Sequence, residues 1–200
     1  MQEIATSRLV LAAGDLWREA VNPRFLRALA DGTLAPTAFQ RWLVQDYHFA
    51  NGLLSFQAVM TSKAPREGHG LLIGGLAALE QELAWFERHA ERLGLRLNSP
   101  VHPVGRRYVD YLIAAAYVQP FGVQAAILFA VEAAYLAAWS ALSPAGPYAE
   151  FIARWSNTQF AEYVRRLGAL AQHHQHPQQA EHFNQVLKHE RDFWEMTWDT

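Results

Sequence analysis

The sequence predicts an all-α fold, a helical bundle of about seven or eight helices in a single domain over residues 1–200. Apolar residues recur at the three- and four-residue spacing of a helix face along nearly the whole chain. Strand signals are almost absent, because valine and isoleucine are sparse and no Asn-Gly or Asp-Gly turn separates alternating runs. With 51% hydrophobic and 18% charged residues, the chain is long enough to bury one sizeable core.

Proline and glycine mark the ends of the predicted helices. Pro36 suits the first turn of a long helix that Ala64-Pro65 closes, and Gly94 is a natural carboxyl-terminal glycine for the next one. Glycines between residues 68 and 75 weaken the start of that next helix, so we expect it to begin late or to bend. In chain order the predicted helices cover residues 7–20, 23–31, 36–63, 67–93, 105–118, 120–142, 148–172 with an interruption near 155–158, and 178–198.

Bulk composition excludes several classes of function. The net charge is -2 and no basic block is present, which argues against nucleic acid as the main partner. The first residues do not read as a signal peptide, and no apolar stretch reaches the ~20 residues of a membrane helix. We therefore expect a cytoplasmic protein without a membrane partner. The absence of cysteine excludes disulfides, thiolate metal sites and a cysteine nucleophile.

One carboxylate stands on an otherwise apolar helix face in the 36–63 segment. Asp46 shares that face with Phe49, Leu53 and Phe56, since all are spaced by three or four residues. A lone acid in such a position is either a core ion with a hidden partner or a group that meets a ligand.

The 120–142 helix is apolar nearly all round, which is typical of a central, buried helix. Glu132 is its only charge, and Tyr135 and Trp139 lie on the same side of the helix. Glutamate is seldom buried without a partner, and no cation lies one turn away along the helix. A structural ion pair is possible, but we favour a Glu132 that faces a cavity, because perturbed carboxylates gather in clefts.

The last helix carries many charges, and periodicity divides them. Glu190 and Phe193 share one face, whereas Arg191, Asp192 and Glu195 point outward. On the pattern alone a solvated helix face is the simpler interpretation. A buried tyrosine of the core is likewise the commoner explanation for Tyr108, which begins the 105–118 helix with Tyr111.

A carboxylate-bridged metal site is an alternative use of the same acids. Glu82 and His89 lie two turns apart on one face of the 67–93 helix and, with Glu132, could supply three ligands. Most histidines are merely packed or exposed, so we expect neither a metal nor another cofactor.

Three blocks together resemble the TenA/thiaminase II family. They are Phe39-x-x-Trp42-Leu-x-Gln45-Asp46-Tyr-x-Phe49, the acid-containing central helix, and Glu190-x-x-Phe193-Trp194. The resemblance spans about residues 25–198. It implies the haem-oxygenase-like all-α fold, a role in thiamin salvage and a homo-oligomer, either a tetramer or a dimer.

The resemblance also implies roles for individual residues. Asp46 is similar to the aspartate that hydrogen-bonds the aminopyrimidine ring, and Tyr108 to a pocket tyrosine near the reacting carbon. Glu190 resembles the terminal glutamate that transfers protons, with Phe193 packed beside it. The residues expected to bind substrate are Asp46, Phe49, Tyr108, Tyr135, Trp139 and Phe193.

The chain departs from the family pattern at informative positions. The usual nucleophilic cysteine is absent, and Glu132 resembles its replacement in a cysteine-less, glutamate-type branch. Phe49 and Trp155 stand where pocket tyrosines are common. These departures fit the branch that hydrolyses aminopyrimidine breakdown products of thiamin, with either an amino or a formylamino group on the methyl substituent.

Without a thiol, water is the expected nucleophile, and two carboxyl groups divide the proton transfers. We expect Glu132 and Glu190 to be that pair, with Asp46 holding the substrate. Two other interpretations remain open from the sequence. One is a metal-dependent oxidase of the same fold that uses Glu82, His89 and Glu132. The other is a binding or regulatory homologue that has kept the pocket and lost the chemistry.

Overall fold

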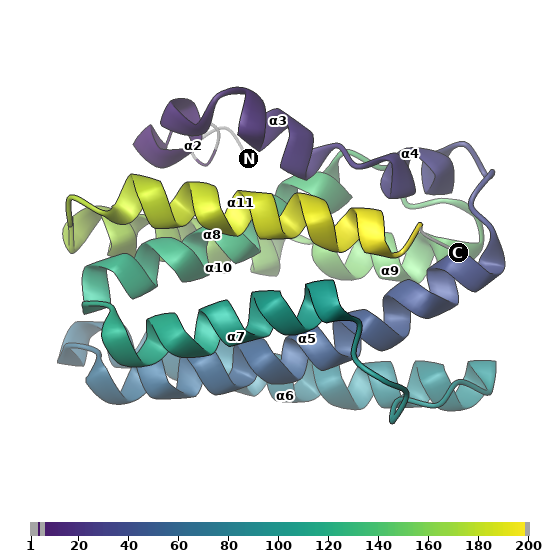
Figure 1. Ribbon diagram of the computed structural model, residues 1–200, viewed down its shortest axis with the longest axis horizontal. Coiled ribbons are helices and arrows are strands. Elements are labelled where there is room, and N and C mark those ends of the chain that lie inside the picture. The colour runs from purple at the N-terminus through teal and green to yellow at the C-terminus, as the bar shows by residue number, and fades with distance from the viewer. Residues whose placement is uncertain (1–3, 5–6, 199–200) are drawn as a thin grey trace. The chain divides into compact units, whose positions relative to one another are not determined.

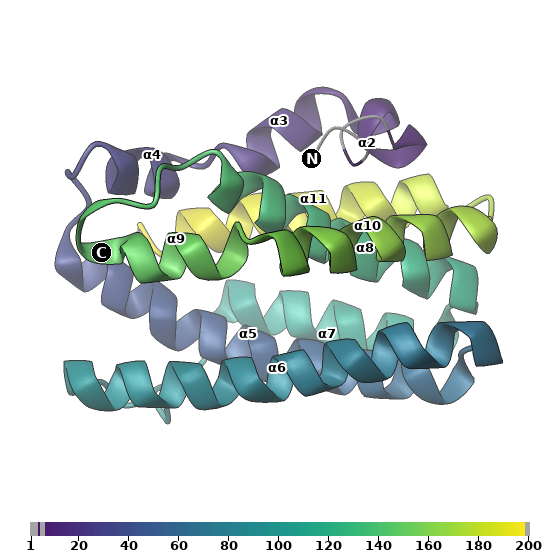
Figure 2. The ribbon, with the colours of Figure 1, turned by 180° about the vertical axis from the view of Figure 1, so that it is seen from behind.

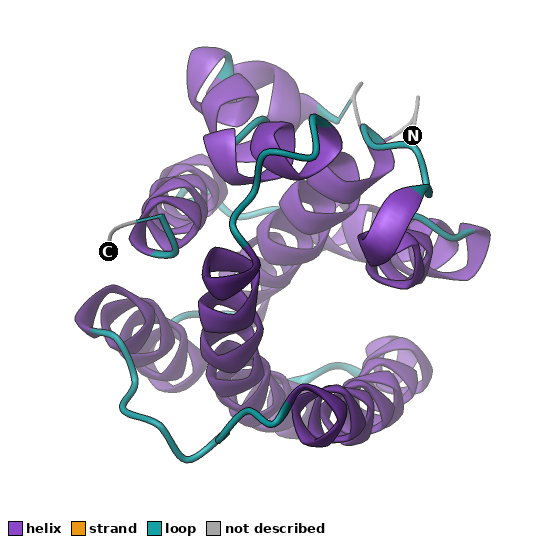
Figure 3. Cartoon of the chain, turned by 90° about the vertical axis from the view of Figure 1, so that its right-hand side faces the viewer, coloured by secondary structure: helices purple, strands orange, loops and turns teal. Residues whose placement is uncertain are grey.

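The structure, a computed structural model, describes Ile4 and residues 7–198. Every regular element in this part of the chain is a helix, as the absence of strand colour in Figure 3 shows. The chain divides into two compact units. Unit 1 comprises Met1–Leu34 and Gly122–Glu195, and unit 2 comprises Ala35–Phe121 and Met196–Thr200. The expectation of a single domain over residues 1–200 stays a prediction.

Unit 2 is built on the long helix α5 (Pro36–Lys63), which packs against α6 (Arg66–Leu93) and α7 (Pro103–Val118) (Figure 1). Gln57 of α5 donates to the Leu72 carbonyl of α6, and Tyr47 of α5 donates to Glu87 further along α6. These two contacts run in opposite directions along the helices, so α5 and α6 are antiparallel. The predicted bounds of the 36–63 helix are confirmed.

Helices α5 and α7 run in the same direction. The ring of Phe49 lies 4.7 Å from that of Tyr108. Further along both helices, the Lys63 ammonium donates to the Ala116 carbonyl at 2.7 Å and to the Tyr117 carbonyl at 3.0 Å. A cation suits the carboxyl end of α7, because the last carbonyls of a helix have no partner within it. Because α5 and α7 are parallel, the chain has to run back between them, and the antiparallel helix α6 makes this connection.

In unit 1, α8 (Phe121–Ser140) packs against α10 (Thr158–His173) and α11 (Gln179–Met196). Figure 2 shows these helices from behind. The remaining elements of the unit are α2 (Arg8–Ala13), α3 (Asp15–Val21), α4 (Arg24–Ala30), the 3-10 turn η1 (Gly146–Tyr148) and α9 (Ala149–Trp155). Side chains on every side of α8 are buried, which confirms the prediction of a central helix.

Helix α8 is long and apolar enough to span a membrane by length and composition, contrary to the expectation that no stretch reaches that size. However, 78% of its most apolar window is buried inside the protein. Core helices of soluble proteins pass the same test of length and composition.

A buried glutamine joins the start of α8 to its neighbours. Gln179 is fully buried, and its Nε2 donates to the carbonyl oxygens of Gly122 at 2.8 Å and Ala171 at 2.9 Å. The His174 carbonyl lies 3.2 Å from the same nitrogen, and Arg8 donates to Oε1. One side chain therefore ties the amino ends of α8 and α11 to the carboxyl end of α10.

Two predicted helices differ from the structure. The 7–20 segment forms two helices because Gly14, with φ of 54°, breaks the chain between them. Helix α6 begins at Arg66, so the expected late start is wrong, and it continues through its glycines without a break, whereas the expected bend stays a prediction. Its buried side chains Leu72, Leu79 and Phe86 recur every seven residues, and packing of this stripe outweighs the low helix propensity of glycine.

Candidate functional site

The first group of predicted site residues lies on α5 and α7 in unit 2, and we call it the Asp46 group: Asp46, Phe49 and Tyr108. Asp46 is 5% exposed, Phe49 9% and Tyr108 1%. Asp46 and Phe49 are one turn apart on α5, and Phe49 reaches across to Tyr108 with their ring planes inclined at 35°. The structure thus brings a buried carboxyl and two contacting rings together within one helix pair.

Close approach of the backbones permits the ring contact in the Asp46 group. A Cβ on Gly52, one turn after Phe49 on α5, would lie 2.5 Å and 2.6 Å from the two methyl carbons of Val109. Val109 directly follows Tyr108 on α7. The glycine therefore sets how near α7 can come to α5 at this level.

Replacing Gly52 with alanine should destabilise unit 2 and disturb this group. A valine on a helix has one strongly preferred rotamer, so Val109 has little freedom to move aside. Overpacking of this kind costs about 1–3 kcal/mol. Urea unfolding of Gly52→Ala should show the loss, and Gly52→Ala/Val109→Ala should recover most of it. A double variant no more stable than the single one would contradict the proposed contact.

Tyr47, the neighbour of Asp46, faces α6 instead. Its hydroxyl donates to Glu87 at 3.1 Å, and its ring meets Phe86 edge-on at 6.4 Å. Burial, together with the hydrogen bond to Glu87, raises the pKa of Tyr47 above its ordinary value. Tyr47 therefore helps to fix α5 against α6.

The second group lies on α8 and α11 in unit 1, and we call it the Glu132–Glu190 group: Glu132, Tyr135 and Trp139 on α8 with Glu190 and Phe193 on α11. Glu132 is 8% exposed and Glu190 4%. Phe193 and Trp139 are also buried, whereas Tyr135 is partly accessible. Arg191 is exposed, so the predicted division of charges between the two faces of the last helix is confirmed there.

Aromatic contacts place both glutamates on one stretch of the α8–α11 pair. The rings of Phe129 and Phe183 lie 5.9 Å apart, and those of Tyr135 and Trp194 lie 5.8 Å apart and stacked. Glu132 lies between Phe129 and Tyr135 along α8, and Glu190 lies between Phe183 and Trp194 along α11. The two contacts therefore bound the stretch of the α8–α11 pair that carries both residues.

Tyr135 belongs to a dense set of rings beside this stretch. Its ring meets Trp155 of α9 edge-on at 5.3 Å and lies 6.1 Å from Trp139. Trp139 in turn lies 5.0 Å from Trp155 and 6.1 Å from Trp194. Such contacts hold aromatic side chains in fixed orientations. The sequence singled out Trp155 by its position, and the structure gives it the role of supporting Tyr135.

Two residues of the alternative metal site lie on α6 and differ in solvent exposure. Glu82 and His89 are both on α6, where Glu82 is partly exposed and His89 is 6% exposed. His89 Nδ1 lies 2.9 Å from the Trp85 carbonyl, and the two rings are 4.0 Å apart. One ring nitrogen of His89 is thus engaged within its own helix, and a metal role for these residues stays an untested alternative.

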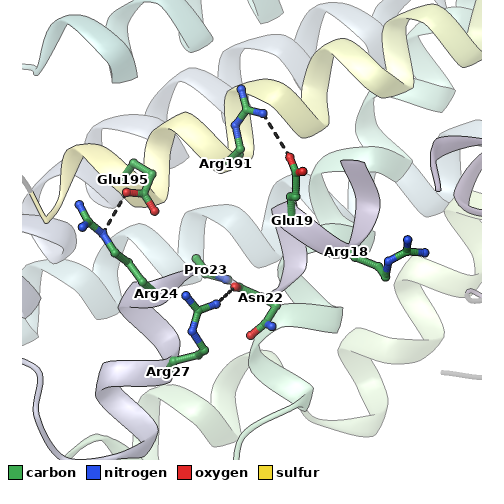
Figure 4. A pocket seen from close by; sticks show the side chains of 8 residues that line it. All are labelled: Arg18, Glu19, Asn22, Pro23, Arg24, Arg27, Arg191 and Glu195. Atoms are coloured by element: carbon green, nitrogen blue, oxygen red, sulfur yellow. Dashed lines mark hydrogen bonds and ion pairs between the residues drawn. The ribbon is translucent and has the colours of Figure 1, made fainter. Parts of the chain in front are cut away.

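A separate surface hollow in unit 1 contains none of the predicted site residues. It has a volume of about 390 Å³ and opens beside α3, α4 and α11 (Figure 4). Its charged side chains largely pair with one another, as in Arg24 with Glu195 at 2.9 Å and Arg191 with Glu19 at 3.3 Å. Because these charges are engaged with one another, we interpret the hollow as part of an ion-pair network that holds α11.

Sequence reasoning missed the residues that fix the helices carrying these groups. Gln45 was part of the recognised block but had no assigned role, and Lys63 and Gln179 were not singled out. All of them bond to backbone groups. A backbone partner has no signature in the sequence, because every residue offers the same carbonyl and almost every residue the same amide.

Comparison with known families and solved structures finds TenA proteins in both cases. The model of the TENA/THI-4/PQQC family matches residues 12–200. The crystal structure of a TenA homologue from Pyrococcus furiosus is 31% identical, with a TM-score of 0.90 over 94% of this chain and 97% of that one. This likeness confirms the all-α, haem-oxygenase-like fold.

Two curated proteins are also similar. A Glycine max protein named "Probable bifunctional TENA-E protein" is 26% identical over 91% of this chain and 88% of its own length. The "Thiamine biosynthesis multifunctional protein ThiED" of Corynebacterium efficiens is 28% identical over 78% of this chain, which corresponds to 22% of that longer protein. From the family match over nearly its whole length, the chain belongs to the TENA/THI-4/PQQC family.

Proposed function

We propose that this protein is a hydrolase that acts on aminopyrimidines formed by breakdown of thiamin. It cleaves the bond between the methylene carbon attached to the ring and the nitrogen of that substituent. Family membership and the thiamine-biosynthesis relative support a thiamin-related function. One observation supports the proposed reaction itself. Two buried glutamates, Glu132 and Glu190, lie on the stretch of α8 and α11 that is bounded by two aromatic contacts, and the chain has no cysteine.

The proposed reaction converts an aminomethylpyrimidine and water into a hydroxymethylpyrimidine and ammonia. Water attacks the methylene carbon, and one carboxylate takes a proton from that water. The other carboxyl group, in its protonated form, gives its proton to the departing nitrogen as the C–N bond breaks. Burial disfavours the charged form of a carboxyl group, which is how one member of such a pair stays protonated. We assign these two proton transfers to Glu132 and Glu190.

Recognition of the ring is assigned to the Asp46 group. An aminopyrimidine offers a flat face, an exocyclic amino donor and ring-nitrogen acceptors. A carboxylate accepts from the amino group, and a carboxylic acid also donates to a ring nitrogen. The adjoining rings of Phe49 and Tyr108 supply apolar area and stacking surface. Tyr135, Trp139 and Phe193 are likewise proposed to bind substrate through their aromatic faces.

Parallel incubation with thiamin, the aminomethylpyrimidine and the formylaminomethylpyrimidine, followed by mass detection of products, tests the proposal. We expect hydroxymethylpyrimidine from one or both pyrimidines and much less cleavage of thiamin. Binding without product, seen as a thermal shift alone, would favour a regulatory homologue. Turnover that requires stoichiometric iron or manganese would favour the oxidase. Either result would overturn the proposed hydrolysis.

A further inference from the structure

A glutamine next to Asp46 bonds the segment that leads into α7. Gln45 Oε1 accepts a hydrogen bond from the backbone N–H of His102 at 2.8 Å, and Gln45 Nε2 donates to the Pro100 carbonyl at 3.1 Å. Both ends of one amide group are therefore used. One turn later on α5, His48 Nε2 lies 3.0 Å from the Ser99 carbonyl.

The bonded segment sets the start of α7. His102 is the amino-cap residue of that helix, and its side chain accepts from the Val104 N–H at 3.2 Å. Gln45 thus bonds to the residue at which α7 begins. Tyr108 follows within the next turns, and a helix rises only about 1.5 Å per residue. A shift of His102 along α5 is therefore passed to Tyr108 as a shift of the whole helix.

Helix α7 is held on α5 at both ends. Gln45 bonds its amino-cap residue, His102, and Lys63 bonds its last carbonyls. Between these ends lies the close approach at Gly52 and the contact of Phe49 with Tyr108. Gln45 and Phe49 are one turn apart on α5, whereas Lys63 is about 25 Å from Asp46 along the helix at the usual rise.

We infer that Gln45 is a positioning residue for the pyrimidine site, because it fixes the register of α7 against α5 and hence Tyr108 against Phe49 and Asp46. This inference rests on the proposed function. Gln45 acts through the backbone of residues 100–102 and has no assigned contact with substrate. It differs from Lys63, which holds the same pair of helices at the far end, and we expect the Lys63 attachment to affect the site much less because it lies about 25 Å from Asp46 along α5.

The test compares three substitutions of similar size on α5. Gln45→Met removes both hydrogen bonds and keeps the side-chain length and the helix propensity. Lys63→Met removes the far attachment. Gln40→Met is the neutral control, since Gln40 has no hydrogen bond within the described residues. For each variant one measures Tm, amide hydrogen exchange of residues 96–104, and the Kd and kcat/KM for the aminomethylpyrimidine.

We expect Gln45→Met and Lys63→Met both to lower Tm, by about 2–4 °C for each kcal/mol lost. Only Gln45→Met should also weaken binding about tenfold and lower kcat/KM by about 10- to 100-fold, because small misplacements of substrate are that costly. Only it should expose the His102 amide to exchange. Gln40→Met should resemble the wild type throughout.

Two results would overturn the inference: wild-type affinity in Gln45→Met, or an equal loss of affinity in Lys63→Met. If Gln45→Met does not fold, Gln45→Glu replaces it in the test. This variant retains the acceptor for His102 but places an ionised carboxylate oxygen against the Pro100 carbonyl, so affinity should still fall. A wild-type protein that binds no aminopyrimidine would refute the proposed function and the ligand part of the inference together. Unchanged exchange at His102 in Gln45→Met would instead refute the attachment of α7 alone.

Discussion

Glu190→Gln should lose most turnover and still bind the pyrimidine. The substitution keeps the size of the side chain and its capacity for hydrogen bonding, but an amide can neither take up nor release the proton that hydrolysis requires. Positioned acid–base groups contribute about 10²- to 10⁴-fold, so kcat should fall by that factor while Kd changes little. Single-turnover kinetics and calorimetric titration with the aminomethylpyrimidine measure the two quantities separately.

Glu195→Gln is the matched control for this experiment. Glu195 lies on the same helix, pairs with Arg24 and is partly exposed, so it should retain wild-type kcat. Exposed ion pairs of this kind contribute only about 0–1 kcal/mol to stability. Near-normal turnover in Glu190→Gln would remove Glu190 from the mechanism, whatever its effect on stability.

Gly122→Ala should be among the most destabilising single substitutions in unit 1. A Cβ at this position would lie 2.0 Å from the carbonyl oxygen of His174 and 3.2 Å from its carbonyl carbon. The obstacle is backbone, so no rotamer change relieves it. The same carbonyl also bonds Gln179, and displacing it would disturb the amide that joins α8, α10 and α11.

We expect a loss of about 3 kcal/mol or more for Gly122→Ala, since overpacking against a fixed neighbour commonly reaches that size. For a chain of this length the loss corresponds to a Tm lower by about 6–12 °C. Gly74→Ala is the control, because nothing lies within 4 Å of its added Cβ. An exposed helical glycine replaced by alanine gains about 0.5–1 kcal/mol. A Gly122→Ala protein as stable as the wild type would contradict the close approach.

The sequence could predict what depends on periodicity and local breakers. The 36–63 helix, the buried and largely apolar α8, and the interruption between α9 and α10 follow from repeating apolar positions and from proline, serine and asparagine signals. Glycine was harder to interpret. Gly14 breaks a helix by its positive φ, whereas the glycines of α6 do not, because packing of Leu72 and Phe86 stabilises that helix.

From the sequence, the acids of the candidate site could be predicted, but the contacts that position their helices could not. Burial of Asp46 and Glu132 follows from acids standing on apolar faces, and both are buried in the structure. For Glu190 the charge pattern alone favoured a solvated face, and its 4% exposure shows that interpretation to be wrong. The positions of Gln45 and Gln179 could not be predicted, because their partners are backbone groups from distant loops and helix ends. Roles of the acids in chemistry stay predictions that the kinetic experiments above decide.

The division of the chain has a consequence for its synthesis on the ribosome. Residues Ala35–Phe121 emerge as one uninterrupted stretch, so α5, α6 and α7 can associate as soon as they are made. Helices α2, α3 and α4 are translated before this stretch, but they have partners that are translated after it, as when Arg8 bonds Gln172, 164 residues further along. Because contacts of such long sequence separation form slowly, α2, α3 and α4 must wait with apolar surface exposed until α10 and α11 leave the exit tunnel.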